Sequence, residues 1–248
     1  MKQFGLIGFP LGHSFSKKYF SEKFERECID AKYDLYELRS ISGFTSLLEN
    51  ENLSGLNVTI PYKVEVIKYL DWLNDTAAKI GAVNTIKFIH INGKQILKGY
   101  NTDAIGFENS INPLLLSIHK KALILGTGGA SKAIDYVLNN KGIETTFVSR
   151  TPKSGMLTYQ QLTKEILSEN LIIINASPVG TFPHSDECPD IPYEFLTEKH
   201  ILFDAVYNPS ITLFMKKGKK QGAKVLNGEE MLKGQAVAAW KIWNSDEI

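Results

Sequence analysis

The feature that most constrains this chain is the alternation of short apolar runs with amphipathic stretches along most of its 248 residues. Short apolar runs separated by segments with helical spacing predict βαβ units and mostly parallel sheets. The predicted fold class is therefore α/β. We expect strands at 3–9, 33–38, 56–59, 122–125, 145–148, 171–175, 201–206 and 224–226, and helical segments at 17–26, 62–73, 104–119, 131–139 and 229–243.

One pair of strands is expected to be antiparallel. The runs 86–91 and 95–100 are joined by Asn92-Gly93, a residue pair that tolerates positive φ in a tight type I′ turn. The first sheet should therefore be mixed.

The domain boundary is placed by the order of the motifs, because the sequence contains no Pro/Gly/Ser-rich linker. A helical segment leaves the hairpin near residue 104, and a new strand opens at Lys121. We expect an α/β domain with a mixed sheet over 1–103. The C-terminal helical segment could cap either domain, and we assign its part over 233–248 to the first, the domain expected to bind a substrate. A Rossmann-type, doubly wound domain is expected over 104–232.

Composition excludes several classes of protein. Hydrophobic residues at 43% and charged residues at 22% are ordinary globular values. The net charge of +1 gives no electrostatic footprint for nucleic acid or an anionic membrane surface, and no apolar run approaches the roughly 20 residues of a membrane-spanning helix. The two cysteines and five scattered histidines predict neither a disulfide scaffold nor a metal site. We expect a cytoplasmic monomer or homodimer with small-molecule partners.

A glycine-rich turn directly follows the predicted strand 122–125 and precedes a helical segment. Strand, turn and helix in this order are typical of a dinucleotide-binding unit, in which glycines let a pyrophosphate approach the N–H groups of the helix. An ordinary strand-to-helix loop is the alternative. The turn consists of Gly126, Thr127, Gly128, Gly129 and Ala130.

The end of the next predicted strand, 145–148, indicates which cofactor the unit prefers. An NAD site usually places Asp or Glu there to accept from the ribose 2′-hydroxyl, and this chain has neither. Arg150 and Lys153, with hydroxyls from Ser149 and Thr151, suit the 2′-phosphate of NADP. The alternative is that both cations are solvated surface residues.

Four polar segments in the first 103 residues each follow or end a predicted strand: 13–16, 57–63, 82–85 and 101–103. Such loops converge at the carboxyl edge of an α/β sheet, where ligands bind. Each also has a structural explanation: Ser16 and Asp103 as helix N-caps, Lys63 as a solvated residue of a first helical turn, and Asn84 as a turn former.

These segments, with further ones in the second half, resemble the shikimate dehydrogenase family essentially from end to end. The resemblance implies reversible NADPH-dependent reduction of 3-dehydroshikimate to shikimate, a step in chorismate and aromatic amino-acid biosynthesis. The chain departs from the usual family pattern at Lys17, Phe20 and Ser149. The matching segments are 8–16, 55–63, 80–85, 99–103, 126–130, 149–151, 175–180, 204–209 and 227–235.

The resemblance also implies roles for individual residues. Those implied to bind the substrate carboxylate are Ser14 and Ser16, with Tyr207 nearby; those implied to hold the ring hydroxyls are Thr59, Lys63, Asn84, Asp103 and Gln235. For the cofactor, the implied contacts are 126–130 at the pyrophosphate, 149–153 at the 2′-phosphate, and Val206 and Gly228 near the nicotinamide.

The reaction needs a proton at the oxygen where hydride delivery leaves a developing alkoxide. Lys63 is the expected proton donor in reduction and acceptor in oxidation, with Asp103 as its orienting partner. Two alternatives remain. One is a quinate/shikimate dehydrogenase that uses NAD, which Arg150 disfavours; the other is a non-catalytic NADP-binding regulator, which the presence of both Lys63 and Asp103 disfavours.

Overall fold

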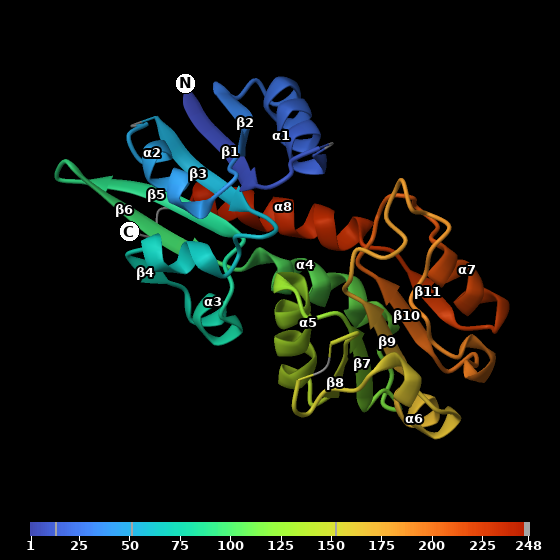
Figure 1. Ribbon diagram of the computed structural model, residues 1–248. Coiled ribbons are helices and arrows are strands. Elements are labelled where there is room, and N and C mark those ends of the chain that lie inside the picture. The colour runs from blue at the N-terminus through green and yellow to red at the C-terminus, as the bar shows by residue number, and fades with distance from the viewer. Residues whose placement is uncertain (13, 51, 152, 246–248) are drawn as a thin grey trace. The chain divides into compact units, whose positions relative to one another are not determined.

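The computed structural model describes residues 1–12, 14–50, 52–151 and 153–245 (Figure 1). The chain divides into two compact units: unit 1 contains Met1–Thr102 and Gln235–Ile248, and unit 2 contains Asp103–Gly234. His13 and Pro152, which belong to two of the predicted motifs, lie outside the described residues. Each unit has its own sheet and its own core. The substrate and cofactor roles expected for the two halves stay a prediction.

Unit 1 is built on a mixed six-stranded sheet, sheet A, with the strand order β2-β1-β3-β5-β6-β4. β1 pairs in parallel with β2 and with β3, whereas β5 runs antiparallel to both β3 and β6. Asn92 and Gly93 between β5 and β6 have φ values of 51° and 75°, which confirms the predicted hairpin. The strands are β1 (Lys2–Gly8), β2 (Ala31–Glu37), β3 (Leu53–Val58), β4 (Trp72–Leu73), β5 (Thr85–Ile91) and β6 (Lys94–Tyr100).

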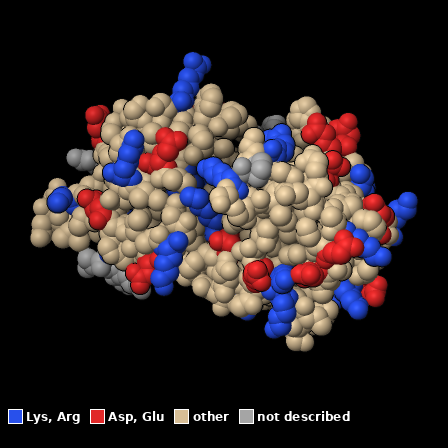
Figure 2. All heavy atoms as spheres, turned by 60° about the horizontal axis from the view of Figure 1, so that its bottom comes forward, with Lys and Arg blue, Asp and Glu red and all other residues tan. Residues whose placement is uncertain are grey.

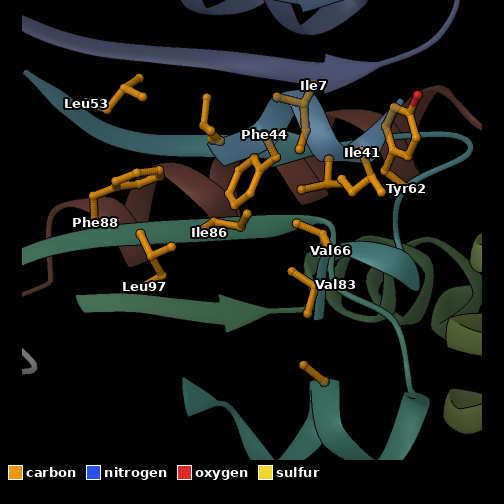
Figure 3. Packing of buried hydrophobic residues seen from close by; sticks show 13 residues of the cluster. Ile7, Ile41, Phe44, Leu53, Tyr62, Val66, Val83, Ile86, Phe88 and Leu97 are labelled. Atoms are coloured by element: carbon orange, nitrogen blue, oxygen red, sulfur yellow. The ribbon is translucent and has the colours of Figure 1, made fainter. Parts of the chain in front are cut away.

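Apolar cores cover both faces of sheet A. On one face α1 (Phe15–Arg26) and the unit 1 part of α8 (Glu229–Trp243) enclose a largely aromatic cluster. On the other face, Figure 3 shows strand residues such as Ile86 packed against Phe44. The elements on or next to this second face are η1 (Ile41–Gly43), α2 (Phe44–Leu47), η2 (Glu65–Tyr69) and α3 (Asp75–Ile80).

Trp243 anchors the end of α8 to sheet A. Its indole N–H donates to the carbonyl of Ile86 at 3.0 Å. A Cβ atom at Gly55 would lie only 2.3 Å from Trp243 Nε1, so glycine in β3 makes room for the ring. Because α8 also carries Gln235, this contact fixes one of the predicted substrate residues relative to the sheet.

Unit 2 is built on sheet B, whose five strands are all parallel in the order β11-β10-β9-β7-β8. Strands of a parallel sheet with helices on both faces are buried and apolar throughout. The strands are β7 (Lys121–Leu125), β8 (Glu144–Val148), β9 (Ile172–Asn175), β10 (Ile201–Asp204) and β11 (Lys224–Leu226).

The helices of unit 2 lie on both faces of sheet B. Leu202 packs in one cluster with Leu167 and Phe214, whereas the ring of its neighbour Phe203 meets Phe107 with 5.0 Å between centroids. Successive residues of a strand point to opposite faces, so the sheet is doubly wound, as predicted. The helices are α4 (Thr102–Ile111), α5 (Gly129–Asn140), α6 (Lys164–Glu169) and α7 (Leu213–Lys220), with short η3 (Asn112–Leu114), η4 (Tyr159–Gln161) and η5 (Tyr193–Phe195).

Two predicted helices are wrong in extent. The segment 62–73 forms a turn, the 3₁₀ helix η2 and the short strand β4. The helix expected over 104–119 ends at Ile111, because Pro113 follows in η3 and has no N–H to continue the α-helical bonding. The predicted C-terminal helix is confirmed at 229–243.

The surface carries charges of both signs, and Figure 2 shows them interspersed over one face. Within the described ranges, no helix is long and apolar enough to cross a membrane. Among the same residues, no group of three His, Cys, Asp or Glu side chains is arranged to hold a metal ion.

Candidate functional site

The loops after β1 and β3 lie side by side at the carboxyl edge of sheet A. β2 and β3 flank β1 on opposite sides, which creates a topological switch point, the usual ligand position in open α/β sheets. The Thr59 N–H donates to Ile7 O at 2.9 Å, and the Phe9 N–H donates to Ile60 O at 3.0 Å. The loop of Ser14 and that of Lys63 therefore start from neighbouring strands.

The two serines expected to bind a carboxylate have different local roles. Ser14 is the N-cap of α1, and its hydroxyl oxygen accepts from the Lys17 N–H at 3.3 Å. Ser16 lies inside the first turn and is 7% exposed. The alternative that Ser16 is the helix cap is therefore wrong, because Ser14 caps α1.

Asn84 is the centre of a buried polar cluster. Its Oδ1 accepts from the Thr102 N–H at 2.6 Å, and its Nδ2 donates to Gln235 Oε1 at 3.3 Å. Asn84 reaches the carboxyl edge of β3 because it precedes β5, which runs antiparallel to β3. We call Asn57, Asn84, Thr85, Thr102 and Gln235 the amide–hydroxyl cluster; all five are less than 9% exposed.

Lys63 and Asp103, the expected catalytic pair, are each connected to a segment that contributes to this cluster. Lys63 is half-buried in the turn after β3, and its carbonyl accepts from the Val83 N–H at 2.7 Å, one residue before Asn84. Asp103 is 6% exposed in the first turn of α4 and follows Thr102 directly. By the division of the chain, Lys63 belongs to unit 1 and Asp103 begins unit 2.

The glycine-rich turn of unit 2 lies at the switch point of sheet B, between β7 and β9. Gly126 has φ of 111°, and a Cβ atom there would lie 3.2 Å from the backbone of Ala176 and Ser177, so the turn needs glycine. Gly128 is the N-cap of α5, where no side chain caps the helix and a Cβ atom would meet nothing within 4 Å. An uncapped helix start with open space beside Gly128 fits a pyrophosphate.

The loop after β8 presents exposed cations. Ser149 is buried, and its hydroxyl oxygen accepts from the Thr151 N–H at 3.2 Å, so it shapes the loop. Arg150, Thr151 and Lys153 are exposed. Burial raises the pKa of Tyr159, and the charge of Arg150 opposes that rise, which places Arg150 near this ring.

Val206 and Gly228 lie together at the ends of β10 and β11. The Gly228 N–H donates to Val206 O at 3.2 Å. A Cβ atom at Gly228 would lie 2.3 Å from Ala205 O, so this approach also requires glycine. Tyr207, one residue beyond Val206, is 40% exposed, and partial burial raises the pKa of its phenol.

A buried carboxylate that the sequence analysis did not single out supports this region. Asp204 is fully buried and accepts from Thr212 Oγ1 at 2.6 Å, from Asn175 Nδ2 at 2.9 Å and from the Val206 N–H at 3.0 Å. Burial raises the pKa of Asp204 to about 6, although the three hydrogen bonds favour the ionised form. The bond to Val206 also explains why β10 ends at Asp204 and not at residue 206. We call Asn175, Asp204 and Thr212 the Asp204 cluster.

Sequence reasoning also missed part of the amide–hydroxyl cluster. Asn57, Thr85 and Thr102 lie in or beside predicted motifs, but no role was assigned to them. The sequence offered one signal for this cluster, the amide of Asn57 inside the apolar run of β3. A buried amide needs hydrogen-bonding partners, so other polar side chains had to lie nearby.

These features define a class of protein: an α/β protein of two units, one with a buried polar cluster at the carboxyl edge of a mixed sheet and one of Rossmann type with a glycine-rich turn at its switch point. A family model described as the shikimate dehydrogenase substrate binding domain matches residues 6–86. The chain is 38% identical to a shikimate dehydrogenase (NADP(+)) of Clostridium beijerinckii, over 100% of this chain and 94% of that protein.

Solved structures of shikimate dehydrogenases have the same fold as this chain. The crystal structure of shikimate dehydrogenase from Aquifex aeolicus superposes with a TM-score of 0.85 at 34% identity, covering 100% of this chain and 94% of that chain. The Thermus thermophilus enzyme in complex with NADP(H) and shikimate gives 0.84 at 30% identity, covering 98% and 94%. The chain belongs to the shikimate dehydrogenase family, and relatives of this chain are named as NADP-dependent shikimate dehydrogenases, which are oxidoreductases.

Proposed function

We propose that this chain catalyses the reversible NADPH-dependent reduction of 3-dehydroshikimate to shikimate, a step in chorismate and aromatic amino-acid biosynthesis. The observation that carries the proposal is the amide–hydroxyl cluster, in which Asn84 and Gln235 meet although they are far apart in sequence. The complex of the Thermus thermophilus relative with NADP(H) and shikimate supports it.

The substrate is a cyclic polyol with one carboxylate, and the site offers matching groups. Hydroxyl donors at Ser14 and Ser16, with Tyr207, bind the carboxylate, since hydrogen bonds to a charged acceptor are the stronger kind. Thr59, Asn84 and Gln235 bind the ring hydroxyls. Amide and hydroxyl groups both donate and accept, as recognition of an alcohol requires.

The residues of unit 2 fit NADP. The uncapped start of α5 behind Gly126–Ala130 holds the pyrophosphate, and Arg150 and Lys153, with Ser149 and Thr151 shaping the loop, hold the 2′-phosphate. Val206 and Gly228 approach the nicotinamide. When bound, NADPH supplies the hydride. The chain's own task is to orient both reactants and to exclude water.

Lys63 handles the proton. In reduction its ammonium donates to the substrate oxygen as negative charge develops there, and in oxidation its amine accepts the proton back. Asp103 orients the ammonium and the reacting hydroxyl. The carbonyl of Lys63 is held by Val83, so the turn that carries the ammonium is fixed to the segment that carries Asn84.

We also assign substrate binding to residues 1–103 with 233–248 and cofactor binding to residues 104–232. The match of the substrate-binding-domain family model to residues 6–86 supports the first part. We infer that the protein works in the cytoplasm as a monomer or homodimer on small-molecule partners alone, without nucleic acid, membrane or metal. Its two free cysteines are compatible with a reducing compartment.

The test is an assay of NADPH formation from NADP with shikimate, and of NADPH consumption with 3-dehydroshikimate. We expect activity with shikimate and NADP that exceeds activity with quinate or with NAD. Tight NADP binding without turnover of either substrate would favour a regulator. A preference for quinate and NAD would favour a quinate/shikimate dehydrogenase.

A further inference from the structure

Asp204 is a charged group at a position where charge lowers stability. It ends the apolar strand β10, its side chain is fully buried, and burial raises its pKa to about 6. At neutral pH the carboxylate is therefore ionised, but at a cost in stability, because the same group is better solvated in the unfolded chain. A neutral residue would avoid this cost, so the charge requires a separate explanation.

Three donors converge on this carboxylate. Oδ1 accepts from the Val206 N–H at 3.0 Å and from Asn175 Nδ2 at 2.9 Å, and Oδ2 accepts from Thr212 Oγ1 at 2.6 Å. A carboxylate only accepts, so it satisfies all three, whereas an asparagine would turn its NH₂ group towards one of these donors. The surroundings of Asp204 therefore fit a carboxylate and not its neutral isostere.

The bonds from Val206 and Thr212 close a loop. Residues 205–211, which we call the Val206 loop, connect β10 to α7. Thr212 is 1% exposed and is the N-cap of α7, since its hydroxyl oxygen accepts from the Met215 N–H at 3.3 Å. One carboxylate thus holds the start of the loop through a backbone N–H and its end through the residue that begins the next helix.

The Val206 loop is also bonded to its neighbours in unit 2. The carbonyl of Asn208 accepts from the Phe182 N–H at 3.1 Å, and the carbonyl of Val206 accepts from the Gly228 N–H at 3.2 Å. The approach of Gly228 is close, because a Cβ atom there would lie 2.3 Å from the carbonyl oxygen of Ala205. A shift of the loop would therefore change the space beside Gly228.

We propose that Asp204 is a positioning residue for the nicotinamide half of the cofactor, acting through Thr212 and the Val206 loop. The inference rests on the proposed function, because it takes Val206 and Gly228 to approach the nicotinamide. Asp204 is fully buried and acts on the cofactor only through the backbone that it holds. The adenosine half, assigned to the loop after β8, should not depend on it.

The experiment compares two ligands that share the adenosine half. NADP includes the nicotinamide, and adenosine 2′,5′-bisphosphate lacks it. Asp204→Asn should raise the dissociation constant of NADP about tenfold, because hydrogen bonds to a charged acceptor become bonds to a neutral one. The dissociation constant of the bisphosphate should change by less than about twofold, since its contacts are independent of this loop.

Isothermal titration calorimetry of the full chain at about pH 8, where wild-type Asp204 is ionised, measures both constants and the number of binding sites. A merely structural role would lower the number of sites for both ligands and leave no difference between them. Equal weakening of both ligands, or no weakening of NADP, would overturn the inference.

Two substitutions at Thr212 test the route from the carboxylate to the loop. Thr212→Val removes the hydroxyl at nearly constant shape and should also raise the dissociation constant of NADP about tenfold. Thr212→Ser keeps the hydroxyl and should bind NADP normally. In the Asp204→Asn background Thr212→Val should have almost no further effect, because both substitutions break the same bond. Additive effects would show that Asp204 does not act through Thr212. If Asp204→Asn does not fold, the two Thr212 variants with the two ligands decide the question.

Thr163 provides a matched control in the same unit. It is the N-cap of α6, and its hydroxyl oxygen accepts from the Ile166 N–H at 3.4 Å. Thr163→Val loses a helix cap, as Thr212→Val does, but α6 holds no proposed cofactor contact. Both dissociation constants should therefore stay unchanged, and a weakening of NADP as large as in Thr212→Val would contradict the inference.

Failure of the proposed function looks different. If wild type binds NADP no more tightly than the bisphosphate, the nicotinamide contacts assigned to Val206 and Gly228 are wrong, and the inference fails with them. If Arg150→Ala leaves the affinity for the bisphosphate unchanged, the assignment of the 2′-phosphate is wrong, whereas the effect of Asp204→Asn on NADP still decides the inference.

Discussion

Each sheet has a switch point at which its strand order reverses, between β1 and β3 in sheet A and between β7 and β9 in sheet B. The carboxyl edges of the two sheets nevertheless present different groups. The edge of sheet A carries side chains, and its buried amide–hydroxyl cluster is uncharged. The edge of sheet B carries exposed backbone N–H groups at an uncapped helix, and the polar cluster behind it contains a buried carboxylate.

This difference follows from the ligands proposed for each unit. A polyol needs many neutral donors and acceptors at fixed positions, which rigid side chains supply. A pyrophosphate needs N–H groups and close approach, which glycines supply. The comparison predicts that substitutions at sheet A affect chemistry and substrate binding, whereas those at sheet B affect cofactor binding and stability.

The largest effect is expected at Lys63. Lys63→Ala should lower kcat by about 10²–10⁴ while leaving substrate binding largely intact, since a positioned proton donor is lost. Asp103→Asn should behave similarly. Steady-state kinetics measure both variants, and Lys68→Ala, in the neighbouring η2, serves as the control with near-normal turnover. Near-native turnover of Lys63→Ala would show that another group donates the proton.

The next largest effect concerns Arg150 at sheet B. Arg150→Ala should lower kcat/KM for NADPH by about 10- to 150-fold, because a charge-assisted phosphate contact contributes about 1.5–3 kcal/mol. NADH should be nearly unaffected, and Arg150→Asp should shift the preference further towards NADH. The measurement is the ratio of kcat/KM for the two cofactors. The exposed Lys164 of the same unit provides a control, Lys164→Ala, in which the ratio should stay constant.

A smaller effect is expected for the serines of sheet A. Ser16→Ala should raise the KM for shikimate about tenfold and lower kcat less, because the carboxylate is remote from the reacting carbon. Ser14→Ala should do the same and also destabilise α1 by about 1 kcal/mol, since the N-cap is lost. Ser14→Gly separates the two roles because glycine is a tolerated cap. If the KM for shikimate is normal in Ser14→Gly, Ser14 is a cap only.

The smallest effect tests the buried carboxylate of sheet B. The pKa of Asp204 is about 6 in the folded protein, above the ordinary aspartate value of about 3.9. Between these values the folded protein binds more protons than the unfolded chain, so the contribution of Asp204 to stability increases as the pH falls through 6. The difference in free energy of unfolding between wild type and Asp204→Asn should therefore rise by about 1 kcal/mol from about pH 7 to about pH 5.

Urea unfolding at a series of pH values measures this difference. Burial lowers the pKa of His200, so its titration destabilises the folded protein as the pH falls. His200 is present in both proteins, so its contribution cancels in the difference. A difference that does not change with pH would mean that Asp204 is ionised over the whole range and that its three hydrogen bonds outweigh its burial.

The sequence by itself determined the local structures whose residues allow few alternatives. The Asn92-Gly93 hairpin formed as expected because both residues adopt positive φ. The glycine turn at Gly126 formed because its φ and its approach to Ala176 exclude a side chain. The helix over 229–243 followed from its apolar spacing, and the α/β class followed from the alternation of apolar runs.

Only the tertiary structure decided which polar groups became partners. Tyr33 looked like an ordinary aromatic strand residue, and its hydrogen bond to Asn57 exists because β1 lies between β2 and β3. Asp204 looked like the end of a strand, and the loops after β9 and β10 gave it buried donors that hold those loops in place. Hydrogen-bonding partners of buried groups come from strand order and register, which bring together residues distant in sequence, and local residue patterns carry little information about that order.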